Sequence, residues 1–180
     1  MRPRLGILLS GSGTTYANLA LAGLPADIAV VIGSKAGLGG LDKAVANGHP
    51  TVVADTPDTV TAALRAHGVQ WVAMCGWLKY WDPPGEFAGR TVNVHPSLLP
   101  AFGGPGMYGR KVHVAALAHG VKITGCTVHF VAGGYDSGPI LDQLAVAVAP
   151  DDTPDTLQAR VQDAERVLYP RVLRTLLART

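Results

Sequence analysis

The feature that most constrains the fold is a regular alternation of apolar, β-rich runs with segments of helical spacing. Four runs in the first half are typical of strands buried on both faces: residues 5–9, 28–32, 51–54 and 70–75. The segments between them have helical spacing: residues 14–22, 41–47 and 57–66. Such alternation predicts a parallel sheet with helices on both sides. The sequence therefore indicates an α/β, three-layer, Rossmann-like fold with a mostly parallel central sheet.

The second half follows a different pattern, because two prolines at 83–84 interrupt the alternation. We expect strands at 91–94, 123–131 and 138–148, a glycine-rich loop at 100–109, and helices at 112–118 and 153–177. The stretch between the last two strands is rich in turn residues and predicts a hairpin connection. A chain of 180 residues without repeat or linker is expected to form a single domain, 1–180, with halves of about 1–90 and 91–180.

Composition excludes several classes of function. The formal charge of +2 is too small, and the arginines too scattered, for a nucleic-acid footprint. No apolar run reaches the roughly 18 to 20 residues of a membrane span, and the N-terminus does not read as a signal peptide, so we expect a cytoplasmic protein without membrane partners. Cys75 and Cys126 are lone cysteines, which we predict to be buried free thiols.

Polar residues occur at the end of the strand predicted at 91–94. Asn93 and His95 are two positions apart and project to one face, and Pro96 restrains His95 in an extended conformation. An amide and an imidazole together can donate hydrogen bonds to an oxyanion, although the same residues could simply fix a turn. Asp136, in a turn-rich loop, could face the imidazole and accept a proton, directly or through water. Together the three could supply a general acid, a general base and hydrogen-bond donors to an oxyanion.

A glycine loop lies between the first strand and the first helix. Gly11 and Gly13 stand where backbone N–H groups and a helix dipole can receive an anion, but a tight turn with Ser12 or Thr14 as cap is an equal alternative. The loop lacks the third glycine of a dinucleotide fingerprint and the Gly-Lys-Ser/Thr of a P-loop. A single phosphate group is therefore favoured over a dinucleotide or triphosphate.

Two other uses of the polar residues are disfavoured. Histidines, cysteines and Asp136 are metal-ligand types, but none shows the paired spacing that fixes zinc on one element, so we predict no metal. His113, His119 and His129 are expected to be structural or solvent-facing. A serine hydrolase is disfavoured because the Gly-x-Ser-x-Gly motif is absent.

Two motifs carry a family resemblance. Asn-x-His-Pro-Ser-Leu-Leu-Pro at 93–100, followed by Asp-x-Gly-Pro at 136–139, resembles the folate-dependent formyltransferase family, and the similarity extends over nearly the whole chain. The resemblance implies a formyltransferase fold, with a phosphate-binding first half and a folate-binding, catalytic second half. It also implies transfer of a formyl group from 10-formyltetrahydrofolate, as co-substrate, to the amine of glycinamide ribonucleotide in purine biosynthesis. No metal or tightly held cofactor is implied.

The resemblance also implies roles for single residues. Asn93, His95 and Asp136 match the catalytic triad, and Glu165 matches a substrate contact in the last helix. The substrate phosphate would bind at Gly11, Ser12, Gly13, Thr14 and Thr15. The folate would bind at Met74, Trp77, Leu78, Lys79, Tyr80, Trp81, Val131 and Tyr135, with core packing as the alternative for the tryptophans. The chain departs from the family pattern at Thr14-Thr15, usually Ser-Asn, at Lys79, often Arg, and at Gln162, often Lys.

Two other functions remain open at this point. A formyltetrahydrofolate hydrolase shares the triad and uses water as the acceptor. A non-catalytic Rossmann-like nucleotide-binding module would explain the glycine loop and the sheet, but not three convergent polar groups. The sequence leaves a monomer and a homodimer equally open.

Overall fold

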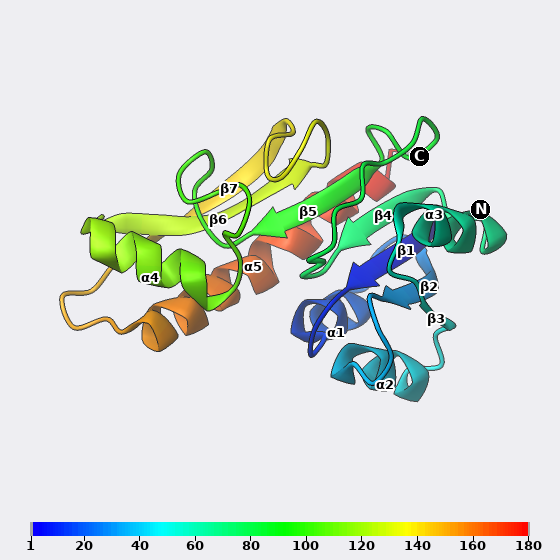
Figure 1. Ribbon diagram of the computed structural model, residues 1–180, viewed down its shortest axis with the longest axis horizontal. Coiled ribbons are helices and arrows are strands. Elements are labelled where there is room, and N and C mark those ends of the chain that lie inside the picture. Colours follow the sequence, from blue (N-terminus) through cyan, green and yellow to red (C-terminus); the bar gives the residue numbers. More distant parts are fainter. Residues whose placement is uncertain (1, 180) are drawn as a thin grey trace.

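The computed structural model describes residues 2–179 and contains one seven-stranded sheet with five helices (Figure 1). The strand order is β3-β2-β1-β4-β5-β6-β7. The strands are β1 Arg4–Leu9, β2 Asp27–Gly33, β3 Thr51–Val53, β4 Trp71–Met74, β5 Thr91–His95, β6 Ile123–Phe130 and β7 Ile140–Ala147. The helices are α1 Thr14–Leu21, α2 Gly39–Ala46, α3 Pro57–Ala66, α4 Arg110–His119 and α5 Pro154–Leu177.

Strand direction changes part-way through the sheet. The pairings among β1 to β5 are all parallel, whereas β5–β6 and β6–β7 are antiparallel. The short connection between β6 and β7 requires an antiparallel pair, since a parallel crossover needs a dozen residues or more. The predicted α/β fold with a mostly parallel sheet is confirmed.

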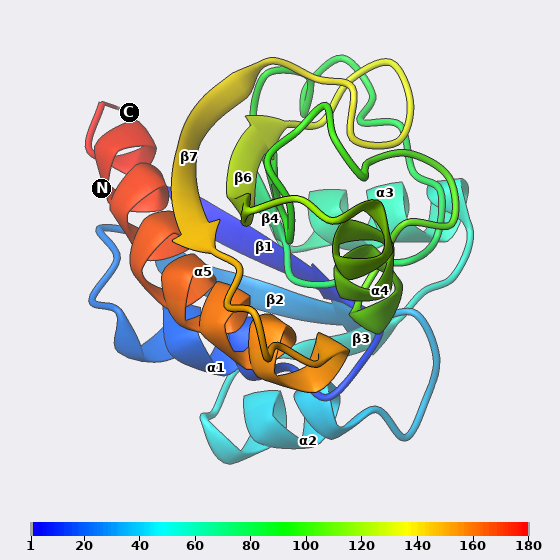
Figure 2. The same ribbon diagram turned by 90° about the vertical axis from the view of Figure 1, so that its left-hand side faces the viewer.

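Helices cover both faces of the sheet, and each face has its own apolar cluster. Alternate residues of β1 point to opposite faces, so Leu5 and Ile7 join a cluster with α1, α2 and α5, whereas Leu8 joins one with α3. Figure 2 shows α5 running along one face of the sheet, with α3 on the other side. The strands β1 and β4 are buried nearly throughout, as expected for strands covered on both faces.

Helix α5 is fixed at its start and in its middle. Thr153 forms a capping box with Thr156, and Pro154 occupies the first turn, where a proline is tolerated. The hydroxyl of the buried Tyr169 shares its one proton between the carbonyls of Met74 and Val92, at 3.1 and 2.9 Å. These bonds hold α5 against β4 and β5, the two strands that lead into the candidate site.

Both cysteines are buried free thiols, as predicted, and burial raises the pKa of each. Among the five helices of residues 2–179, none combines the length and the apolar character needed to cross a membrane.

Candidate active site

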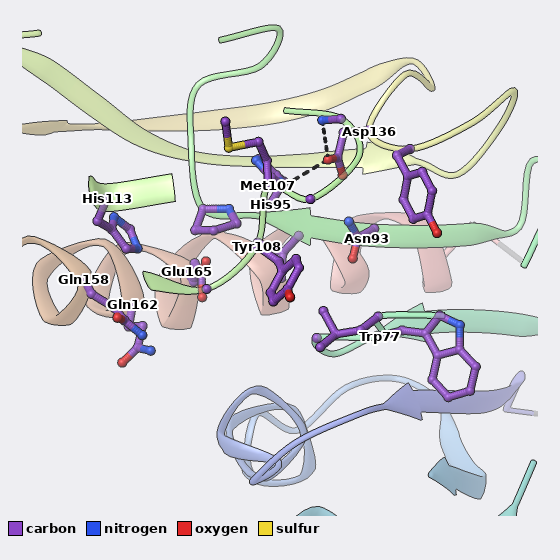
Figure 3. A pocket seen from close by; sticks show the side chains of 18 residues that line it. Trp77, Asn93, His95, Met107, Tyr108, His113, Asp136, Gln158, Gln162 and Glu165 are labelled. Atoms are coloured by element: carbon purple, nitrogen blue, oxygen red, sulfur yellow. Dashed lines mark hydrogen bonds and ion pairs between the residues drawn. The ribbon is translucent and has the colours of Figure 1, made fainter. Parts of the chain in front are cut away.

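A cavity of about 340 Å³ opens where β4 and β5 end (Figure 3). The carboxyl ends of parallel strands are where open α/β sheets bind ligands. Asn93 and His95 reach the cavity from β5, Asp136 from the β6–β7 connection, and Glu165 from α5. Segments 76–78 and 104–109 supply further walls. The three predicted catalytic residues therefore meet at one cavity, although forty residues lie between His95 and Asp136 in the sequence.

The imidazole of His95 is held between two acceptors. Its Nε2 lies 2.9 Å from the carbonyl oxygen of Phe102, and its Nδ1 lies 3.4 Å from Oδ2 of Asp136. A carbonyl only accepts, so Nε2 carries a proton, and a second proton on Nδ1 gives the carboxylate a favourable partner. A doubly protonated ring would satisfy both contacts. We expected His95 to donate a hydrogen bond to an oxyanion, and both of its ring nitrogens already face acceptors within the protein.

Asp136 is arranged to stay ionised. Its Oδ2 accepts a hydrogen bond from the Gly104 N–H at 2.9 Å, and its backbone adopts the left-handed conformation with φ 54°. Burial raises the pKa of Asp136, but the hydrogen bond and charge of His95, with smaller effects from Gly104 and His129, lower it below its ordinary value. The carboxylate thus balances the charge of His95 inside a partly buried site.

His129 lies in the same cluster and is buried, which agrees with the expectation of a structural residue. Its side chain is 2% exposed, its Nδ1 donates to the carbonyl of Phe130, and its Nε2 accepts from the Asn93 amide at 3.2 Å. Burial lowers the pKa of His129, which favours the neutral ring that this pattern requires. One N–H of Asn93 is therefore fixed by His129, and its second N–H is left to bind a ligand.

Replacing His129 by leucine is expected to lower the turnover rate about tenfold while leaving folate affinity nearly unchanged, because the Asn93 amide loses its fixed orientation. His129→Gln keeps an acceptor and should restore part of the rate. Steady-state kinetics of both variants test this, with His67→Gln as a control, at a histidine outside the cavity whose ring nitrogen Nδ1 bonds the carbonyl of Ala63 on α3. Equal rates for His129→Leu and the control would contradict the positioning role.

Glu165 is the second carboxyl group of the cavity. Figure 3 shows it projecting from α5 toward the cavity, on the same side of the helix as Gln162. Burial raises the pKa of Glu165 to about 7, although the charges of His95 and Arg166 act in the opposite direction. Within residues 2–179 its carboxyl has no hydrogen bond or ion pair. A partner for this group must therefore come from a ligand or from solvent.

The predicted folate residues line the main cavity and a smaller adjoining space of about 60 Å³. Trp77, Tyr135, Asn93 and Asp136 border both spaces. Leu78 borders only the first, and the other predicted residues border the second: Met74, Lys79, Tyr80, Trp81 and Val131. The structure thus gathers all eight predicted residues around one continuous region.

Two of these aromatic residues also have packing roles. Trp81 is 3% exposed, packs on Phe87, and donates from Nε1 to Thr61 at 3.0 Å, so the core-packing alternative holds for most of its surface. Tyr80 is half-exposed and meets Tyr135 edge to face, with ring centroids 5.6 Å apart. This pair forms an aromatic wall suited to a flat heterocycle.

The predicted phosphate loop follows β1 at the same edge of the sheet but does not border the main cavity. Helix α1 begins there without a side-chain cap and without an acidic residue in its first turn. The ammonium of Lys43 donates to the carbonyl of Ser12 at 2.8 Å, and the Leu78 N–H donates to Ser10, which ties the loop to the cavity wall. Free N–H groups beside a lysine favour an anion next to, and outside, the main cavity.

Replacing Gly13 by alanine is expected to lower the free energy of unfolding by about 1–3 kcal/mol, because the residue has φ 74° and an added Cβ would lie 2.4 Å from the Gly40 Cα. Gly11→Ala is a matched control, since nothing lies within 4 Å of its added Cβ. Urea unfolding of both variants measures the difference. Equal midpoints would show that the loop accommodates the methyl group.

No three histidine, cysteine or acidic side chains are placed to hold a metal ion anywhere in the part of the chain that the structure describes.

Comparison with known proteins places the chain in a family. Residues 5–173 match the family model described as formyl transferase. The chain belongs to the formyl transferase family. It is 37% identical to the chloroplastic phosphoribosylglycinamide formyltransferase of Arabidopsis thaliana, over 96% of this chain and 64% of that protein. This chain therefore spans less than two thirds of the length of that curated relative.

Solved structures of family members have the same fold. The glycinamide ribonucleotide transformylase 1 of Symbiobacterium toebii superimposes with a TM-score of 0.90 at 35% identity, covering 98% of this chain and 88% of the other. The phosphoribosylglycinamide formyltransferase of Brucella melitensis gives 0.88 at 39% identity, with 99% and 97% covered. These matches confirm the family resemblance and the formyltransferase fold that the two motifs implied.

Proposed function

We propose that the chain transfers a formyl group from 10-formyltetrahydrofolate to the amine of glycinamide ribonucleotide. The observation that carries the proposal is the convergence of Asn93, His95 and Asp136 at one cavity, with His95 and Asp136 3.4 Å apart. Similarity over nearly the whole of this chain to proteins named for this activity supports the choice of acceptor. Purine biosynthesis, a cytoplasmic location and no resident metal or cofactor are parts of the same proposal.

The contacts of the three residues support the role that we propose for each. The acceptor amine attacks the formyl carbon, and the carbonyl oxygen becomes an oxyanion. The second N–H of Asn93 donates to this oxygen. The imidazolium of His95, which borders the same cavity from β5, stabilises the negative charge. Asp136 keeps His95 protonated and helps to move a proton from the attacking nitrogen to the departing folate nitrogen.

The two substrates would occupy different parts of the site. The folate ring would lie against Trp77, Tyr80 and Tyr135, and the phosphate would bind at loop 11–15 with Lys43 beside it. Because this loop lies outside the main cavity, a phosphorylated amine would reach from the loop inward, toward His95. The sequence assigned the phosphate to half 1–90 and the folate to half 91–180; Trp77 and Tyr80 lie in the first of these, so the folate region would draw on both halves.

A spectroscopic assay tests the proposal. The enzyme is mixed with 10-formyl folate, with and without glycinamide ribonucleotide, and the absorbance of the deformylated product is followed. Turnover that requires the acceptor is the expected result. Turnover without it would favour the hydrolase, and no turnover in either mixture would favour a non-catalytic binding module.

A further inference from the structure

His95 and Asp136 are both bonded to one short stretch of backbone, segment 102–104. The carbonyl oxygen of Phe102 lies 2.9 Å from Nε2 of His95, and the N–H of Gly104 donates to Oδ2 of Asp136 at 2.9 Å. The same carboxylate oxygen faces Nδ1 of His95, at 3.4 Å (Figure 3). Segment 102–104, the imidazole and the carboxylate therefore form a closed ring of contacts, and the backbone makes two of its three links.

The ring contains the two unusual backbone conformations of the protein. Within residues 2–179, the only non-glycine residues with a positive φ are Phe102 and Asp136, and both have φ 54°. A bulky residue such as phenylalanine rarely adopts this left-handed conformation, and it persists only where the surrounding structure holds it. Strained residues of this kind are concentrated at functional sites. Both of them here belong to the contacts that join the imidazole to the carboxylate.

The turn before segment 102–104 is fixed by β6 and β7. The hydroxyl of Thr127 donates to the carbonyl of Ser97 at 2.7 Å and accepts from the N–H of Leu99 at 3.0 Å. The amide of Gln143 donates to the carbonyl of Leu99 at 3.1 Å. Because these bonds fix the start of segment 102–104, its carbonyl and its N–H are presented at defined places.

We propose that segment 102–104 is a positioning element for the formyl transfer, which aligns the imidazole of His95 with the carboxylate of Asp136. This inference rests on the proposed function, in which these two groups act on the formyl carbon and the departing nitrogen. The carbonyl of Phe102 accepts the Nε2 proton, so the ring presents Nδ1 to the carboxylate. The N–H of Gly104 fixes the carboxylate oxygen that Nδ1 faces.

Gly103, in the middle of segment 102–104, has no room for a side chain. An added Cβ would lie 2.5 Å from Cδ2 of Leu99 and 3.3 Å from Cβ of Asp136. Leu99 is itself buried, so its methyl group has little space to move into. A methyl group at Gly103 therefore displaces either the segment or Asp136, while the chemical groups of the site all remain.

The test is Gly103→Ala. We expect kcat to fall about thirtyfold, while KM for 10-formyltetrahydrofolate changes less than about twofold, because the alignment is lost and the folate wall is untouched. Burial raises the pKa of Asp136, whereas the contacts of His95, Gly104 and, at 3.7 Å, His129 lower it. Loss of the Gly104 contact raises this pKa, so the acidic limb of the kcat profile should move to higher pH.

Gly85→Ala is the matched control. Gly85 lies outside the cavity and has nothing within 4 Å of an added Cβ, and neither it nor Gly103 has a left-handed backbone that alanine would strain. A kcat equal to that of the control, a loss confined to KM, or an acidic limb that stays in place would overturn the positioning role.

A second variant removes one contact and adds no atom. Glycolic acid in place of Gly104 turns the amide into an ester, so Asp136 loses the N–H donor. We expect about a tenfold fall in kcat with the same movement of the acidic limb, whereas the same exchange at Gly85 should have no effect. Unchanged kinetics of the ester at position 104 would count against the inference even if Gly103→Ala does not fold.

A measurement without turnover separates this inference from the proposed function. The Nε2 proton of His95 is expected to give a low-field NMR signal in the resting protein, because the carbonyl of Phe102 protects it from exchange; its absence in His95→Gln assigns it. The signal should shift or disappear in Gly103→Ala and remain in Gly85→Ala. An unchanged signal in Gly103→Ala would exclude the alignment role, whereas failure of the wild type to transfer the formyl group would refute the proposed function and leave the signal in place.

Discussion

Replacing Asp136 by asparagine is expected to lower the rate of formyl transfer about a hundredfold or more, as for loss of a proton-transfer group. The amide keeps the size of the carboxylate and can still accept from the Gly104 N–H. It cannot balance the charge of His95, whose Nδ1 then faces a neutral group. The variant should therefore bind folate nearly as well as the wild type, because the folate wall of Trp77 and Tyr80 is untouched.

Single-turnover kinetics with saturating folate measure the chemical step, and quenching of tryptophan fluorescence measures folate affinity. Asp142→Asn is the matched control, because Asp142 is an aspartate of β7 that pairs with Arg171 and does not border the cavity. A variant at Asp136 that keeps more than a tenth of the wild-type rate would refute its role in proton transfer.

The strands were predictable because a strand that is buried on both faces appears in the sequence as an uninterrupted run of apolar residues. The run at 5–9 became β1, Arg4–Leu9, and the turn-rich stretch before Gly138 became the connection of an antiparallel pair. The position of β6 beside β5 could not be read in the same way. It depends on how the chain returns across the sheet after α4, which no local pattern specifies.

The site was predictable where residue types carry the chemistry. Asn93, His95 and Asp136 stand out as polar groups in motifs, whereas His129 looked like an ordinary strand residue. Only the pairing of Asn93 with His129 across β5 and β6 brings this amide and this imidazole together. The carbonyl of Phe102 and the N–H of Gly104 were also missed, because every residue has these backbone groups and the residue type does not indicate which of them will contact the site.

Glu165 was predicted as a substrate contact, but its unpaired state became visible only in the fold. Its neighbours come from β5, β6, α4 and the segment after β4, so its surroundings depend on packing between distant segments. A carboxyl group without a protein partner lowers stability when it is ionised. Such a cost is typical of residues retained for binding or catalysis.

Glu165→Gln is accordingly expected to stabilise the folded protein at high pH. The pKa of Glu165 is raised from 4.5 to about 7, so the folded state binds this proton more tightly than the unfolded state. Stability from this group is then present below pH 4.5 and is lost as the pH rises toward 7, to a total of about 3 kcal/mol. Glutamine does not titrate, so the variant should exceed the wild type by about this amount at pH 8.5 and match it near pH 4.5.

Urea unfolding at both pH values measures the difference, and subtraction removes the titration of all groups that the two proteins share. Glu86→Gln should show no such gain, because the hydrogen bond from Arg65 lowers the pKa of Glu86 and removal of that carboxylate cannot relieve an unfavourable charge. Equal stability of Glu165→Gln and the wild type at pH 8.5 would mean that the carboxyl ionises freely in the cavity.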